Sequence, residues 1–197
     1  MARKGLPDFE ACPGYPSRVL PEGVHPCDET TFKSRFVARF PQSTTRKGIC
    51  DGFFRFRMDS VAHGFSATQW IDGSFVEEEQ DPHQDPHDVD VVTFVDYDWL
   101  NGAPPDILRF WNEVLDGRSA TKRKYSTHAF AYPACPQDHA YYPYFERARR
   151  YWREWLGGTY DKSHPAGKAQ PRHAKGFVSM VMGDVTRAPH VSTEGSK

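Results

Sequence analysis

Hydrophobic positions recur along the chain in two patterns, which predict helices and strands. A spacing of ~3.6 residues, typical of a helix with one apolar face, occurs in four segments, at 28–39, 44–63, 105–115 and 141–156. Runs of β-branched and aromatic residues predict four strands, at 67–71, 89–95, 124–132 and 177–182. In chain order these elements predict an α/β or α+β fold, a mixed sheet of about four strands with helices packed on it.

Proline-rich and polar stretches set the limits of one domain. Residues 1–27 are rich in proline and glycine, which predicts an extended segment that runs over the surface. Residues 28–185 hold all the predicted helices and strands, and residues 186–197 have the composition of a flexible tail. A chain of 197 residues with 14 % aromatics is long enough to bury a sizeable core.

The composition of the chain limits the expected cellular location more than it limits the expected function. A net charge of −1 gives no overall attraction for nucleic acid, so a polyanion would have to meet a local patch. No apolar run approaches the ~20 residues of a membrane span, and the N-terminus lacks the apolar core of a signal peptide. The four cysteines include no Cys-x-x-Cys pair, which favours free thiols in a cytoplasmic protein over a structural zinc site.

The strongest chemical signal lies between the first and second predicted strands, at the end of 67–71 and the start of 89–95. Gly73 and Ser74 end an apolar strand, and Asp88 and Asp90 flank one valine at the start of the next. Residues two apart on a strand project from the same face, so both carboxylates can meet one divalent cation such as Mg²⁺ or Mn²⁺. Glycine lets a phosphate approach the backbone, and the Ser74 hydroxyl adds a donor.

This pattern resembles the nucleotidyltransferase superfamily of DNA polymerase β, in which an apolar residue, Gly and Ser precede an Asp-apolar-Asp-apolar strand. More broadly, residues 19–183 are similar to a bacterial branch of small single-domain nucleotidyltransferase-like proteins. The resemblance implies a nucleotide-binding, two-metal enzyme that transfers a nucleoside monophosphate from an NTP or dNTP to a hydroxyl of a protein or nucleic acid. It also implies a toxin–antitoxin or phage-defence setting with a protein partner. The alternative is a catalytically weakened module of the same fold that binds nucleotide or neutralises a partner.

The position that matches the family's third carboxylate carries His128. Neutral imidazole is a poor ligand for Mg²⁺ and an acceptable one for Mn²⁺, and it can act as a general base near neutral pH. Three interpretations stay open. His128 is the base or a ligand for a softer metal; it marks a site that binds nucleotide without turnover; or it is an ordinary strand histidine. In the last case the third acid is supplied elsewhere, for example by Asp96, Asp98 or Asp138.

Three further groups of residues are candidates for contacts around this site. The resemblance places Lys175 near the cleft, where its ammonium would hold a β- or γ-phosphate. The acidic loop of residues 77–88 contains His83 and His87, and it is expected to act as a lid over the nucleotide or, less favourably, as a separate metal site. In the last predicted helix, Tyr144 and Tyr151 are expected to pack on the sheet, with Arg149 on a solvated face.

Overall fold

The computed structural model of the chain describes residues 5–79, 85–116, 118–159 and 173–192. Its larger sheet has five strands, in the order β3 (Gly23–Pro26), β8 (Gly176–Met182), β4 (Ala67–Asp72), β6 (Val89–Asp96) and β7 (Thr127–Ala134). A smaller antiparallel sheet joins three short strands, β1 (Glu10–Ala11), β2 (Ser17–Val19) and β5 (Glu78–Glu79). The protein is therefore a mixed α/β structure.

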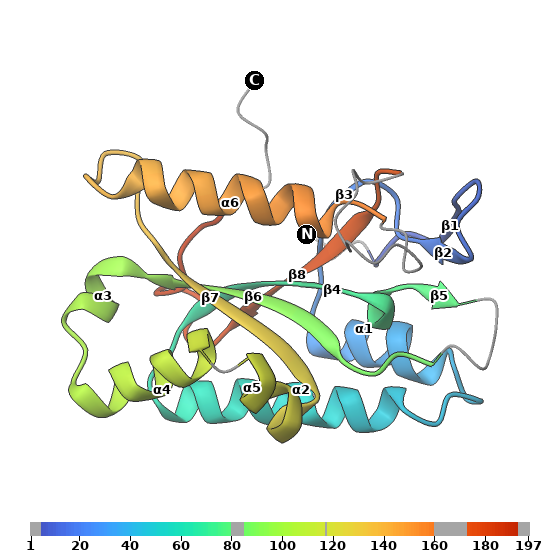
Figure 1. The fold of residues 1–197 in the computed structure, drawn as a ribbon, viewed down its shortest axis with the longest axis horizontal. Coiled ribbons are helices and arrows are strands. Elements are labelled where there is room, and N and C mark those ends of the chain that lie inside the picture. Colours follow the sequence, from blue (N-terminus) through green and yellow to red (C-terminus); the bar gives the residue numbers. More distant parts are fainter. Residues whose placement is uncertain (1–4, 80–84, 117, 160–172, 193–197) are drawn as a thin grey trace.

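Helices cover both faces of the larger sheet (Figure 1). One face carries α1 (Glu29–Lys33) with the π-helical turn η1 (Ser34–Ala38), α2 (Arg46–Ala62), α4 (Pro105–Asp116) and α5 (Arg118–Tyr125). The other face carries α6 (Tyr142–Leu156), and α3 (Tyr97–Asn101) follows β6 directly. None of the helices within the described ranges combines the length and apolarity that a membrane span requires.

The central strands are mixed in direction. β6 pairs antiparallel with β4 and parallel with β7, while β8 pairs antiparallel with β4 and parallel with β3. Because β6 is a central strand and helices cover both faces of the sheet, its β-branched residues are buried on both faces, as a run from Val89 to Val95 predicts. The N-terminal end of β6 lies beside the C-terminal end of β4 and the N-terminal end of β7, so residues that start or end these strands meet at one edge.

Local signals account for where the first helices begin and end. The side chain of Asp28 caps α1 by accepting a hydrogen bond from the backbone N–H of Thr31 at 2.8 Å. The Ser43 hydroxyl accepts from the N–H of Arg46 at 3.1 Å, and Gly64, with φ +82°, follows the end of α2. These are the helices that the hydrophobic spacing predicts at 28–39 and 44–63, and both are confirmed.

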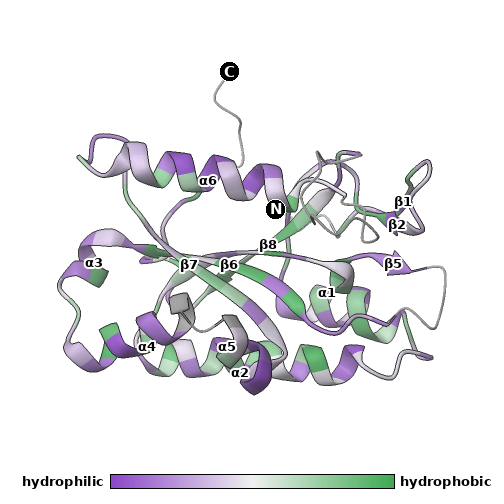
Figure 2. Ribbon diagram, in the orientation of Figure 1, coloured by the Kyte–Doolittle hydropathy of each residue, from purple (hydrophilic) through white to green (hydrophobic). Residues whose placement is uncertain are grey.

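Apolar side chains form one cluster on each face of the sheet. The cluster beneath α1 and α2 is rich in phenylalanine, and Phe32, with no exposed surface, packs against the rings of Phe36, Phe53, Phe54 and Phe75. The cluster beneath α6 contains Trp70, Phe94, Trp152 and Phe177. Figure 2 shows the resulting alternation along α6, where hydrophobic residues interrupt a hydrophilic helix.

The structure has more strands than the four that the sequence predicts: β3 adds a fifth to the larger sheet, and β1, β2 and β5 form a second sheet. The additional strands β1, β2 and β3 lie within residues 1–27, and Phe9 and Leu20 from this segment are each only 1 % exposed. These strands contain only two to four residues and lie among glycines and prolines, so the composition of the segment is that of a loop. Pairing with β8 and with the edge strand β5 gives them regular structure.

Two expectations about the second half of the chain were wrong. Lys124 and Tyr125 belong to α5, and β7 begins at Thr127 after Ser126, whose φ is +52°. On α6 the buried face consists of Phe145, Arg149, Trp152 and Leu156. Tyr144 and Tyr151 are exposed instead, because a tyrosine ring tolerates water and the tryptophan and phenylalanine next to them do not.

Part of the segment at 186–197 packs on the domain. Val191 is buried in the cluster beneath α6, and the Pro189 carbonyl accepts a hydrogen bond from the Thr68 hydroxyl at 2.7 Å. The structure describes this segment as far as residue 192.

Candidate functional site

Three polar residues occupy one row across the edge of the sheet. Asp90 on β6 is the register partner of Asp72 on β4 and of His128 on β7. Side chains alternate along a strand, so residues two apart project from the same face. The residues two positions from Asp72, Asp90 and His128 are Trp70, Val92 and Phe130, and all three pack in the cluster beneath α6. Asp72, Asp90 and His128 therefore project from the same face of the sheet, the face that carries α6.

Asp90 and His128 are in direct contact. The imidazole Nδ1 lies 2.9 Å from Asp90 Oδ1, and the two side chains are 33 % and 30 % exposed. When Nδ1 carries the proton and donates to the carboxylate, Nε2 presents its lone pair. The pair can thus accept a proton at Nε2 while Asp90 stabilises the imidazolium that forms.

Gly73 packs directly against the Asp90 carboxylate. Its backbone has φ +88° and ψ −179°, a conformation that is essentially restricted to glycine. A Cβ at this position would lie 2.5 Å from Asp90 Oδ2. Ser74 follows at the start of the short 3₁₀ turn η2 (Ser74–Val76) and is half-buried. The predicted Gly-Ser turn and the second aspartate of the motif are therefore neighbours in space.

Asp88 precedes β6 by one residue and pairs with α5. Its Oδ2 lies 2.7 Å from Lys122 Nζ, and the lysine side chain is 51 % exposed. An ion pair this open to solvent contributes little to stability, so a competing cation can displace the ammonium. Val89 and Val91, the apolar residues of the motif, are fully buried as predicted.

Lys175 points at two carboxylates. Its ammonium lies 3.0 Å from Asp72 Oδ1 and 2.6 Å from Glu77 Oε1, and all three side chains are at least nine-tenths buried. Glu77 also accepts from the Tyr15 hydroxyl at 3.0 Å. Sequence reasoning singled out Lys175 but neither acid. Asp72 was the available signal, because a charged residue at the end of a buried strand needs a buried partner.

One ammonium meets two carboxylates in this cluster, so one negative charge is in excess. Glu77 is closer to Lys175 and has Tyr15 as a second partner. Burial raises the pKa of Asp72 to about 7, against the attraction of Lys175 and with added repulsion from Glu77. Burial opposes the charge on Lys175, but the two acids outweigh it and raise the pKa of its ammonium. The exchangeable proton of the cluster therefore belongs to Asp72.

Stability is expected to depend on pH through Asp72. Its pKa is about 7 in the folded protein and 3.8 ordinarily, so between these values the folded state holds one proton more than the unfolded state. The free energy of unfolding should then fall by up to ~1.4 kcal/mol per unit as pH rises through this window. Urea unfolding of wild type and Asp72→Asn, from pH 4 to 8, measures the effect. The difference between the two curves should grow in favour of the variant up to about pH 7; parallel curves contradict the assignment.

The acidic loop is described only in part. His83 lies outside the described residues, and His87 is exposed. Asp85 Oδ2 accepts hydrogen bonds from the Thr44 backbone N–H at 2.7 Å and from its hydroxyl at 3.0 Å, just before α2. Among the described side chains no three of His, Cys, Asp or Glu converge as a ready ligand set for a metal ion.

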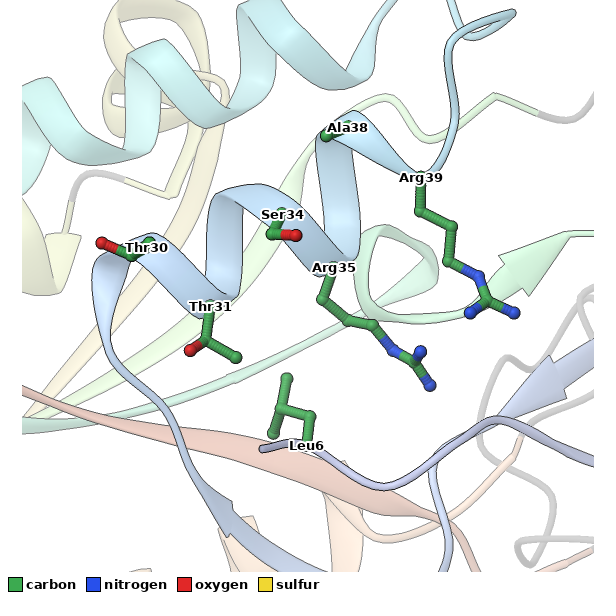
Figure 3. A pocket seen from close by; sticks show the side chains of 7 residues that line it. All are labelled: Leu6, Thr30, Thr31, Ser34, Arg35, Ala38 and Arg39. Atoms are coloured by element: carbon green, nitrogen blue, oxygen red, sulfur yellow. The ribbon is translucent and has the colours of Figure 1, made fainter. Parts of the chain in front are cut away.

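A groove of about 600 Å³ lies between α1, η1 and Leu6 (Figure 3). Its two basic side chains, Arg35 and Arg39, are engaged by carboxylates of this chain: Arg35 pairs with Asp8 at 3.0 Å and Arg39 with Glu78 at 2.7 Å. The groove therefore offers no uncompensated charge for a ligand, and we assign it no role.

Comparison with protein-family models places most of the chain in one family. Residues 13–181 match the model described as a family of unknown function, DUF6932. The chain belongs to this family. The matched stretch runs from β2 into β8 and spans the positions of Gly73, Asp90 and His128. Searches of curated proteins and of solved structures gave no match.

Proposed function

We propose that this DUF6932 protein is a metal-dependent nucleotidyltransferase that transfers a nucleoside monophosphate from an NTP or dNTP to a hydroxyl. One observation carries the proposal: the Gly73–Ser74 turn, the Asp90 carboxylate and the His128 imidazole, from three different strand ends, meet at one edge of the sheet. A phosphate-accessible turn beside carboxylates is the arrangement that such a transfer needs. We also propose that the mixed α/β fold described above is a nucleotidyltransferase fold.

The donor set at the edge suits a hard divalent cation. Asp88 and Asp90 offer carboxylate oxygens, which Mg²⁺ and Mn²⁺ prefer, and these two residues would hold the ion. When bound, the metal would supply neutralisation of charge on the triphosphate. Holding the ion would free the exposed partner of Asp88, Lys122, whose ammonium could then pair with a phosphate.

The remaining steps belong to side chains of this chain. The Ser74 hydroxyl donates to a phosphate oxygen, and the open face of Gly73 lets the phosphate approach the backbone. His128 Nε2 takes the proton from the acceptor hydroxyl as its oxygen bonds to the α-phosphorus, and the bond to pyrophosphate breaks. Asp90 Oδ1 holds the resulting imidazolium. Direct binding of a phosphate by Lys175 stays a prediction, since its ammonium faces Asp72 and Glu77.

The proposal is tested by incubating the protein with labelled ATP, GTP or dATP in the presence of Mg²⁺ or Mn²⁺. Pyrophosphate release and label transfer to a hydroxyl acceptor are the expected results. The acceptors to test are nucleic acids and proteins encoded beside this gene, such as a toxin or a defence effector. Absence of pyrophosphate release with either metal overturns the proposal, whether or not the protein binds the nucleotide.

A second candidate is a module of the same fold that binds nucleotide without turnover. It is favoured by the two pairs at the edge, because Asp88 and Asp90 are already engaged by Lys122 and His128. This candidate predicts tight nucleotide binding and no pyrophosphate under any metal. The same incubation therefore separates the two functions.

A further inference from the structure

The segment from Asp72 to Glu77, which contains the Gly73–Ser74 turn, is fixed at both ends by one lysine. Lys175, just before β8, lies 3.0 Å from the Asp72 carboxylate and 2.6 Å from the Glu77 carboxylate. The three side chains are almost completely removed from solvent. Because the two acids are the first and last residues of the segment, the single ammonium ties its ends together.

A second buried cation holds the middle of the same segment through the backbone. The Arg46 guanidinium, at the start of α2, donates to the carbonyl oxygens of Phe75 at 2.5 Å, Glu77 at 2.8 Å and Ser74 at 3.4 Å. Arg46 is 2 % exposed, and its guanidinium carbon lies 4.0 Å from the centroid of the Phe40 ring. A planar fork with five donors can satisfy several carbonyls at once, which an ammonium cannot.

These contacts determine where the turn directs its backbone N–H groups. In a trans peptide unit the N–H points opposite to the C=O. Arg46 holds the Ser74 and Phe75 carbonyls on one side, so the N–H groups of Phe75 and Val76 are directed to the other side. Val76 donates to the Gly73 carbonyl at 3.1 Å, which closes the turn.

Burial of two cations is an expensive way to stabilise a fold, since apolar residues of similar size usually do so at least as well. Burial also lowers the pKa of Arg46 to about 10, although the side chain keeps its charge at neutral pH. Arg46 also donates to the Phe36 carbonyl of η1 at 3.2 Å, but its other three hydrogen bonds and both ion pairs of Lys175 fall on the Asp72–Glu77 segment. An arrangement that costs this much and is concentrated on one six-residue segment is better explained by the conformation that it imposes.

We propose that Arg46 and Lys175 are positioning residues that hold the Asp72–Glu77 segment as a preformed binding loop for the triphosphate. The inference rests on the proposed function, because it assigns the nucleotide as the ligand of this loop. Neither residue needs to touch the nucleotide. Each acts through the segment, and preorganisation of the segment lowers the entropy that binding would otherwise cost.

Arg46→Lys is the first test, because it keeps the charge and removes the fork. Hydrogen exchange of amides 73–77 should become at least ~10-fold faster, while exchange in β6 and β7 is unchanged. Affinity for whichever of ATP, GTP and dATP the wild type binds most tightly should fall ~10-fold, and affinity for its monophosphate by no more than about twofold. A general loss of structure would weaken both ligands alike. Calorimetric titration with Mn²⁺ present measures the affinities for the triphosphate and for the monophosphate.

Arg57→Lys is the matched control. Arg57 is also a largely buried arginine of α2, and its pKa is likewise lowered to about 10 by burial. It donates to the Gln69 side chain and to the Val181 carbonyl, not to the Asp72–Glu77 segment. Its substitution should leave exchange at 73–77 and the ratio of triphosphate to monophosphate affinity at their wild-type values.

The lysine is tested by a triple variant, Asp72→Asn, Glu77→Gln and Lys175→Met, which removes all three charges and leaves none of them buried without a partner. It should fold, exchange amides 73–77 faster and lose triphosphate affinity as Arg46→Lys does. If the wild type binds nucleotide, and Arg46→Lys and the triple variant match it in both hydrogen exchange and affinity, the positioning role is overturned while the proposed function stands. Failure of the wild type to bind any nucleotide overturns the proposed function and the ligand assigned here with it.

Discussion

Asp90→Asn is expected to lower pyrophosphate release by about 1,000-fold, because a metal ligand controls several kcal/mol of transition-state stabilisation. The amide keeps the shape of the side chain and its acceptor oxygen for His128, but loses the anionic charge that a divalent cation requires. Since Asp90 is partly exposed, the free energy of unfolding should change by less than about 1 kcal/mol. Initial rates with a saturating NTP and thermal unfolding of the same preparations give the two numbers.

Asp98→Asn is the matched control for this substitution. Asp98 is also an aspartate within reach of a histidine, with Oδ1 3.6 Å from His139 Nε2, but it lies in α3 beyond the opposite end of β6. Its release rate should equal that of the wild type. If the protein turns over nucleotide and the wild type, Asp90→Asn and Asp98→Asn release pyrophosphate at equal rates, Asp90 has no role in the transfer.

The motif was the part of the site that the sequence could predict, because strand alternation is a local property. Asp90 lies between two buried valines, so a strand that buries them must turn its carboxylate to the other face. The contact between Asp90 and His128 is different in kind. It depends on the parallel register of β6 with β7, and no local pattern specifies which residues of two strands become partners.

The cluster of Lys175, Asp72 and Glu77 shows why contacts between distant segments could not be predicted from the sequence. Lys175 and Glu77 are 98 residues apart in the chain, and their contact requires β8 to pack beside β4. From sequence, a lysine before a strand and an acid after a turn are each ordinary surface residues. Only their burial together shows that the charges compensate one another. The resemblance to nucleotidyltransferases placed Lys175 near the cleft, but it did not indicate a carboxylate partner.

The helix α6 illustrates a different limit. A helix rich in aromatic and basic residues allows more than one stripe, and the sequence favoured the stripe through Tyr144 and Tyr151. The structure buries Phe145 and Trp152 and adds Arg149, whose Nε donates to Glu146 Oε2 at 2.8 Å. A guanidinium can enter a buried face when a carboxylate on the same helix turn accompanies it. Such a paired charge is invisible to hydrophobic periodicity.

Gly73→Ala is expected to impair the site more than the fold. Alanine at φ +88° and ψ −179° costs ~1–3 kcal/mol of backbone strain, which urea unfolding should show directly. The new Cβ would also lie 2.5 Å from Asp90 Oδ2, and the cheapest relief is rotation of that carboxylate away from the turn. This rotation breaks the contact with His128. Because misplacement of a reacting group by ~1 Å can cost about 100-fold, pyrophosphate release should fall by at least that factor.

Gly64→Ala separates the strain from the collision. Gly64 follows α2 with φ +82°, so alanine there is also strained, but the nearest atom to its Cβ, on Trp99, is 3.6 Å away. Both variants should lose stability, and only Gly73→Ala should lose transfer. If the two variants fall equally in activity, loss of stability explains the effect and Gly73 has no role beside Asp90. If Gly73→Ala alone falls, close approach of the turn to the carboxylate is what the glycine provides, and a larger side chain such as Val at the same position should abolish transfer altogether.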